Sequence, residues 1–147
     1  MSTAVFAFGR FNPPTIGHEK LINAVIATGQ REGGDTFIYG SHSQDSRKNP
    51  LSHSEKMGYL QKMFPRIKKS IQTRAKERNV LQIADTLNKK YDKLILVVGS
   101  DRVDDFTSLL NSYNGIKSKH GFYDYKEIKV YSAGERDPDA DGASGMS

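Results

Sequence analysis

The stretch that decides the fold is Ala4-Val5-Phe6-Ala7-Phe8-Gly9-Arg10-Phe11-Asn12-Pro13-Pro14-Thr15-Ile16-Gly17-His18. Its apolar first part predicts a short buried strand, Gly9 allows the chain to turn, and the adjacent prolines stiffen the loop that follows. Apolar residues then recur at helical spacing, at Leu21, Ile22, Val25 and Ile26. Because the amides and the dipole of a helix start favour an anion, the stretch predicts a phosphate site with Arg10 and His18 as donors.

Further strands predict a parallel sheet. Residues 35–41 read as a second strand, and strand, helix and strand within about forty residues form a βαβ unit with parallel strands. The apolar run at 94–98 predicts a central strand covered on both faces, alternation at 127–131 predicts the last strand, and residues 70–73 are a weaker candidate. We therefore expect an α/β fold with a Rossmann-like doubly wound parallel sheet in a three-layer sandwich, forming a single domain over residues 1–147.

The later helices are predicted from caps and apolar stripes. Ser52 and Glu55 have the spacing of a capping box, and Pro65 stops the helix that they begin. Residues 80–87 form an amphipathic pattern that ends near Lys89 and Lys90.

Glycine and polar residues follow the predicted strands at the edge where open α/β sheets bind ligands. These residues are Gly9 after the first strand, Ser41 as the last residue of the second, and Gly99, Asp101 and Arg102 after the third; Phe8 ends the first strand. Asp101 has two interpretations, since its carboxylate either faces the ligand or caps a helix over residues 103–110.

Composition narrows the class of protein. Charged residues make up 27 % and hydrophobic residues 36 % of the chain. No apolar run approaches the ~20 residues of a membrane span, and no basic region precedes an apolar core at the N-terminus. We therefore expect no membrane partner. The absence of cysteine excludes a disulfide framework and a thiolate zinc site, and it fits a cytoplasmic protein.

The net charge of +5 favours anionic partners. Much of the excess lies in one segment, at Arg66, Lys68, Lys69, Arg74, Lys76 and Arg78. A basic run of this kind is most often a solvated face, and no nucleic-acid signature accompanies it. The sequence therefore favours nucleotide phosphates over nucleic acid as the anionic partner.

Two other features carry weaker expectations. Residues 112–125 read as a mobile loop or lid, whose Tyr113, Phe122, Tyr123 and Tyr125 either stack on a base or pack against the domain. His42, His53 and His120 lack the spacing of metal ligands, and among these three only His42 is expected near the ligand edge. No protein metal site is predicted.

The pattern Gly9-Arg10-Phe11, Thr15 and Gly17-His18 resembles the signature of the nucleotidyltransferase superfamily that carries the (H/T)-x-G-H motif. Its opening is most similar to archaeal-type nicotinamide mononucleotide adenylyltransferases and their phage-encoded relatives, which also makes a viral protein in a host cytoplasm an expectation. Thr15 instead resembles the phosphopantetheine adenylyltransferases. The resemblance implies the HUP or nucleotidylyltransferase type of Rossmann-like fold.

A second block strengthens the resemblance. Residues 49–56 follow Gly40-Ser41 and a polar loop, as in the archaeal-type adenylyltransferases, and Lys48 lies where that family has a basic residue that contacts the triphosphate. The Gly99-x-Asp101 pattern resembles a Gly-x-Asp of the family that lies near the ribose and the base of the nucleotide.

The resemblance implies attack by a phosphomonoester oxygen on the α-phosphorus of a nucleoside triphosphate, with Mg²⁺ sharing the charge. Catalysis would rest on His18, Thr15, Lys48 and Arg10. His18, protonated or as a neutral donor, would stabilise the α-phosphoryl oxygens, while Arg10 and Lys48 neutralise the β and γ phosphates. Nucleotide binding would add Phe8, Gly9, Phe11, Gly17, Ser41, Gly99, Asp101, Arg102 and Ser147. Such enzymes are commonly homo-oligomers.

The C-terminal tail departs from the family pattern. The family closes its site with Ile-Ser-x-Thr-x-x-Arg, and Met146-Ser147 resembles the first two residues of that motif, with Ser144-Gly145 as the alternative register. The final arginine is absent in both registers, so we expect a motif cut short after Ser147.

Three functions remain open on the sequence. The first is an adenylyltransferase that makes NAD from nicotinamide mononucleotide and ATP. The second is a cytidylyltransferase or a phosphopantetheine-adenylyltransferase-like enzyme. The third is a nucleotide-binding or structural module without catalysis, which the missing arginine supports.

Overall fold

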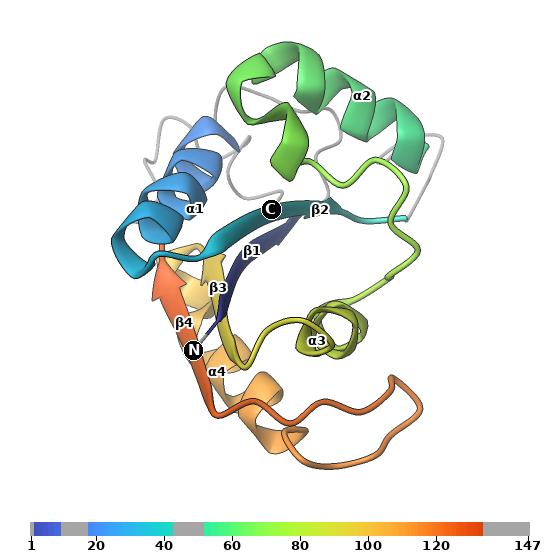
Figure 1. Cartoon of the computed structure of the whole chain (residues 1–147). Helices are drawn as coiled ribbons and strands as arrows, with labels where there is room; N and C mark the ends of the chain where they lie inside the picture. Colours follow the sequence, from blue (N-terminus) through green and yellow to red (C-terminus); the bar gives the residue numbers. More distant parts are fainter. Residues whose placement is uncertain (1, 10–17, 43–51, 134–147) are drawn as a thin grey trace.

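A computed structural model describes residues 2–9, 18–42 and 52–133 of the chain. Its centre is a parallel sheet of four strands: β1 (Thr3–Gly9), β2 (Asp35–Gly40), β3 (Lys93–Val98) and β4 (Glu127–Ser132). The strands lie in the order β2-β1-β3-β4 (Figure 1). The predicted parallel α/β fold is therefore confirmed.

The chain reverses its direction of travel across the sheet between β1 and β3. From β1 it moves outward to β2, and it then returns past β1 to form β3 and β4. The weak strand predicted at residues 70–73 is reduced to one parallel bridge between Ile71 and Ile38 on the outer side of β2. This double winding creates a switch point between β1 and β3, where connections leave towards opposite faces.

Helices cover both faces of the sheet, which gives the expected three layers (Figure 1). One layer contains α1 (Glu19–Glu32), α2 (His53–Met63) and the 3₁₀ helix η2 (Pro65–Ser70). The other contains α3 (Val80–Asn88) and α4 (Val103–Ser112), and the short η3 (Ser100–Arg102) precedes α4. The sheet has an apolar core on each face, because successive side chains of β1 point to opposite faces. Val5 and Ala7 pack with the first layer, while Ala4 and Phe6 pack with the second.

The predicted capping box at the start of α2 is confirmed. The Glu55 backbone N–H donates to Ser52 Oγ at 3.3 Å, and the Ser52 N–H donates to Glu55 Oε1 at 3.1 Å. The helix ends at Met63, and Pro65 then begins η2. These local signals fix where α2 begins, directly after the residues that follow β2.

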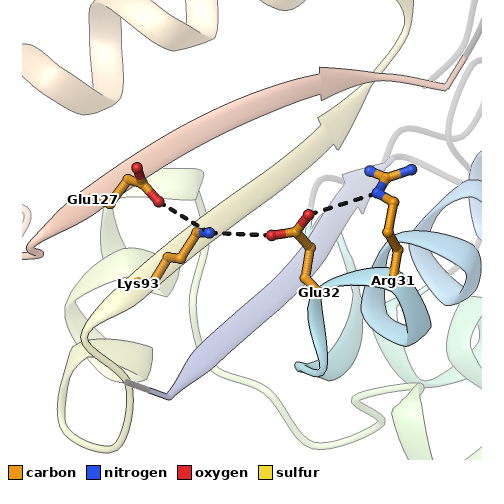
Figure 2. Close-up of polar contacts among 4 residues, drawn as sticks. All are labelled: Arg31, Glu32, Lys93 and Glu127. Carbon is orange, nitrogen blue, oxygen red and sulfur yellow. Dashed lines mark hydrogen bonds and ion pairs between the residues drawn. The ribbon is translucent and has the colours of Figure 1, made fainter.

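An ion-pair chain joins the amino ends of the strands to α1 (Figure 2). Lys93 at the start of β3 contacts Glu127 at the start of β4 at 3.0 Å and Glu32 at the end of α1 at 3.1 Å. Arg31 extends the chain through a 3.6 Å contact with Glu32. The hydrogen bond that Lys93 donates to Glu127, followed by the one that it donates to Glu32, raises the pKa of Lys93. This polar chain lies at the edge opposite the carboxyl ends of the strands.

The prediction of a lid over the ligand edge is wrong for the loop before β4. Because β3 and β4 are parallel, the connection from α4 to β4 reaches the amino edge of the sheet, away from the carboxyl ends. Tyr123 and Tyr125 are buried, and their hydroxyls donate to the carbonyls of Leu110 and Ala84. The alternative prediction, that these aromatic residues pack against the domain, is confirmed for Tyr113, Tyr123 and Tyr125, whereas Phe122 is exposed.

Candidate functional site

The seven predicted site residues that the structure describes lie at the carboxyl edge of the sheet. Phe8 and Gly9 end β1, Ser41 follows β2, Gly99, Asp101 and Arg102 follow β3, and His18 precedes α1. The connections that leave β1 and β3 depart to opposite faces here, which is where open α/β sheets bind ligands. The other predicted residues, Arg10, Phe11, Thr15, Gly17, Lys48 and Ser147, lie outside the described residues.

Hydrogen bonds join the ends of β1 and β2. Gly9 pairs with Gly40 in the parallel register, and the Ser41 N–H donates to the Gly9 carbonyl at 2.8 Å. Ser41 is itself buried. The two strand ends are therefore held side by side at the point where the chain continues into residues 10–17 and 43–51.

Lys56 is a residue of this edge to which sequence reasoning assigned no role. It lies in α2 and is 0 % exposed. Its Nζ donates to Ser41 Oγ at 3.1 Å and to the Ser41 carbonyl at 3.3 Å. A signal was present in the sequence, because Lys56 precedes Leu60 by one helical turn and so falls on the apolar stripe of the helix.

His18 is buried at the N-cap position of α1, with 1 % of its surface exposed. Burial removes water from the ring and lowers the pKa of His18 to about 4. Of the two states that the sequence left open, the neutral imidazole is therefore the one present at pH 7. A neutral ring still offers one N–H to a phosphoryl oxygen.

His42 and His53 form a stacked pair beside the end of β2. Their ring centroids are 4.0 Å apart with an interplanar angle of 2°, and His42 Nε2 donates to the Ala75 carbonyl at 2.8 Å. Burial, followed by the charges of His42 and Lys56, lowers the pKa of His53 to about 4. The expectation that only His42 lies near this edge was wrong, because the capped start of α2 brings His53 back against it.

Asp101 and Arg102 are exposed within η3, directly after the end of β3. Helix α4 begins at Val103 with Arg102 as its N-cap, and no side-chain hydrogen bond caps it. The interpretation of Asp101 as the N-cap of this helix is therefore wrong. The position after β3 leaves its carboxylate on the surface of the ligand edge.

A cavity of about 490 Å³ opens beside this edge, beyond β2. Its wall includes Tyr39 from β2, the segment 71–77 and Thr86 from α3. The His42 bond to Ala75 ties that segment to the residues that follow β2. The cavity is large enough for a small organic ligand, and its lining includes two basic side chains, Arg74 and Lys76, and one acidic side chain, Glu77.

Within residues 2–9, 18–42 and 52–133, no group of three or more His, Cys, Asp or Glu side chains is placed to hold a metal ion. The helices in the same part of the chain include none that is long and apolar enough to cross a membrane.

A doubly wound parallel sheet with a buried histidine at the helix start beside its switch point is an α/β domain of the Rossmann-like type. The chain belongs to the cytidylyltransferase-like family, whose model matches residues 6–136. This match supports nucleotidyl transfer as the general activity and agrees with the superfamily that the N-terminal pattern resembles. A search of curated proteins and a search of solved structures gave no match.

Proposed function

We propose that this chain transfers a nucleoside monophosphate from a nucleoside triphosphate, ATP, to a phosphomonoester acceptor, nicotinamide mononucleotide, giving NAD and pyrophosphate. The observation that carries the proposal is the assembly of His18 with the ends of β1, β2 and β3 at one edge of the sheet. The resemblance of the N-terminal pattern to the nicotinamide mononucleotide adenylyltransferases supplies the choice of substrates.

The reaction is a single displacement at phosphorus. An oxygen of the acceptor phosphate forms a bond to the α-phosphorus, the bond from the α-phosphorus to its bridging oxygen breaks, and pyrophosphate leaves with that oxygen. Neutral His18 donates its N–H to an α-phosphoryl oxygen and stabilises the charge that grows there. The substrate is the Mg²⁺ complex of the triphosphate, so the metal arrives with the nucleotide.

The remaining roles follow from the resemblance and from position in the fold. Arg10 and Lys48 bind the β and γ phosphates, and Thr15 contacts the acceptor or the α-phosphate. Gly99, Asp101 and Arg102 lie beside the ribose and the base, since they follow β3 at the switch point. The acceptor occupies the cavity beyond β2. Ala75 in the wall of this cavity accepts a hydrogen bond from His42, which follows Ser41.

A second function, transfer from CTP to a sugar or polyol phosphate, is favoured by the family description, cytidylyltransferase-like. Transfer of adenylate to phosphopantetheine is favoured by Thr15. Both keep the same chemistry and change only the base and the acceptor. A module that binds nucleotides without catalysis is the third possibility, because a fold of this kind does not by itself establish catalysis.

The test is release of pyrophosphate by the purified chain, with Mg-ATP or Mg-CTP crossed against nicotinamide mononucleotide, phosphopantetheine and a panel of polyol phosphates. Turnover confined to Mg-ATP and nicotinamide mononucleotide supports the proposal. Turnover with Mg-CTP or with another acceptor would show that the chain is a nucleotidyltransferase with substrates other than those proposed. No turnover with any pair, together with measurable nucleotide binding, contradicts the enzyme and supports the non-catalytic module.

A further inference from the structure

Lys56 is buried at a cost that packing alone does not explain. Among the described residues it is the one lysine or arginine that is fully buried. The neighbouring Met57 and Leu60 contribute to the apolar core. Removing an ammonium group from water is strongly unfavourable unless its partners compensate. A methionine at this position would extend the apolar stripe without that cost, so the retained charge points to a task other than stability.

The partners of Lys56 show what that task is. Its Nζ donates to both oxygens of Ser41, and the Ser41 N–H in turn donates to the carbonyl of Gly9. One buried amine on α2 is thereby linked to the end of β2 and, through Ser41, to the end of β1. These are the two strand ends from which the chain enters residues 10–17 and 43–51.

The charge of Lys56 also acts on its surroundings. It contributes to the lowered pKa of His53, which lies one helical turn earlier in α2 and stacks on His42. The positive charge therefore reaches the carboxyl edge of β2, on the side where an anionic ligand would approach. Glu77 acts on His53 in the opposite direction.

We propose that Lys56 is a positioning residue that holds the ends of β1 and β2, through Ser41, in the geometry that binds the phosphates of the substrate. The proposal rests on the proposed function, since it assumes that phosphates bind at this edge. It assigns Lys56 no contact with the substrate. Its effect passes through the backbone of Ser41 and Gly9.

The experiment compares Lys56→Met, which removes the charge and keeps the length, with Lys56→Arg, which keeps the charge and donors. Met57→Ala is the matched control, because it removes a neighbouring side chain that is also 0 % exposed from the same helix. Four quantities are measured for each variant: the melting temperature, the affinity for inorganic pyrophosphate, KM against kcat for the triphosphate, and hydrogen exchange of the Ser41 amide. Exchange is compared at the same interval below each melting temperature.

We expect Lys56→Met to weaken pyrophosphate binding and raise the triphosphate KM by about tenfold or more, with a smaller change in kcat. Exchange of the Ser41 amide should accelerate by a similar factor, and Lys56→Arg should restore most of the affinity. Met57→Ala should lower the melting temperature while affinity and Ser41 exchange stay within about threefold of the natural chain. If Lys56→Met does not fold, Lys56→Gln is read by the same criteria.

Unchanged affinity and unchanged Ser41 exchange in Lys56→Met would overturn the proposal. So would equal losses in Met57→Ala, because these would show a general effect of destabilising α2.

The failure of the transferase proposal can be distinguished from the failure of the positioning role. A natural chain that binds pyrophosphate without turnover contradicts the transferase while the Lys56 variants still decide the positioning role. A Lys56→Met variant with normal turnover contradicts only the positioning role, and a natural chain with neither binding nor turnover overturns both.

Discussion

His18 combines burial with a place at the start of α1, beside the ends of the central strands. We expect His18→Ala to lower kcat by two to four orders of magnitude, which corresponds to about 3–5 kcal/mol of transition-state stabilisation. Steady-state pyrophosphate release measures this loss. His120→Ala is the matched control, since His120 lies in the loop at the opposite edge of the sheet. Turnover retained in His18→Ala would remove His18 from the catalytic centre.

The same residue predicts how stability depends on pH. The pKa of His18 is about 4 in the folded chain and about 6.5 when it is unfolded, so the unfolded chain binds more protons between these values. Stability is therefore highest above pH 6.5 and falls as the pH drops towards 4, and His18 alone contributes a loss of about 2 kcal/mol between pH 7 and pH 5.

Urea unfolding at pH 7 and pH 5 measures this loss, and His18→Gln should reduce it because glutamine does not titrate. His53 acts in the same direction, since its pKa is also lowered. A decline of equal size in His18→Gln would show that His18 is already charged in the folded chain at pH 5.

At the scale of elements, the start of α2 depends on its capping box. Ser52→Ala removes the side chain that accepts the Glu55 N–H and should destabilise the chain by about 1 kcal/mol. Ser108→Ala in α4 is the control, because Ser108 is exposed within a helix and caps nothing there. Chemical unfolding of both variants measures the difference. Equal stability of the two would show that the box contributes little to this helix.

The ion-pair chain at the amino edge gives a prediction that depends on salt. Lys93→Met breaks contacts with Glu32 and Glu127 and should lower the melting temperature at low ionic strength (Figure 2). The loss should shrink in about 1 M salt, because screening weakens partly exposed ion pairs in the natural chain. Lys126→Met is the control, since Lys126 is largely exposed and its ion pair with Asp92 is long, at 3.8 Å. A loss that does not change with salt would point to packing of the lysine stem instead.

At the scale of the whole molecule, the strand order predicts which backbone amides exchange their hydrogens most slowly. Strands β1 and β3 each have a hydrogen-bonded neighbour on both sides and a helical layer on both faces, while β2 and β4 lie towards the edges. Native-state hydrogen exchange should therefore find the slowest amides in β1 and β3, at rates set by global unfolding. Faster exchange in β1 than in β4 would contradict a common core that spans the switch point.

The sequence by itself determined the regular elements and their class. Apolar runs, the capping box and Pro65 act through neighbours along the chain, so the extents of β3 and α2 could be predicted from local pattern. The βαβ rule predicts that the carboxyl ends of the strands share one edge of the sheet. Gly9, Ser41 and Gly99 could therefore be assigned to that edge from the sequence.

Only the tertiary structure decided which residues far apart in the sequence share that edge and in which state. The stacking of His53 on His42, the burial of Lys56 against Ser41 and the neutral state of His18 depend on packing between elements that no local pattern encodes. The same holds for the aromatic loop before β4, which composition suggested as a lid and parallel pairing places at the opposite edge. Burial and hydrogen bonding at a site are properties of the assembled layers, and this is the physical reason why they could not be predicted one segment at a time.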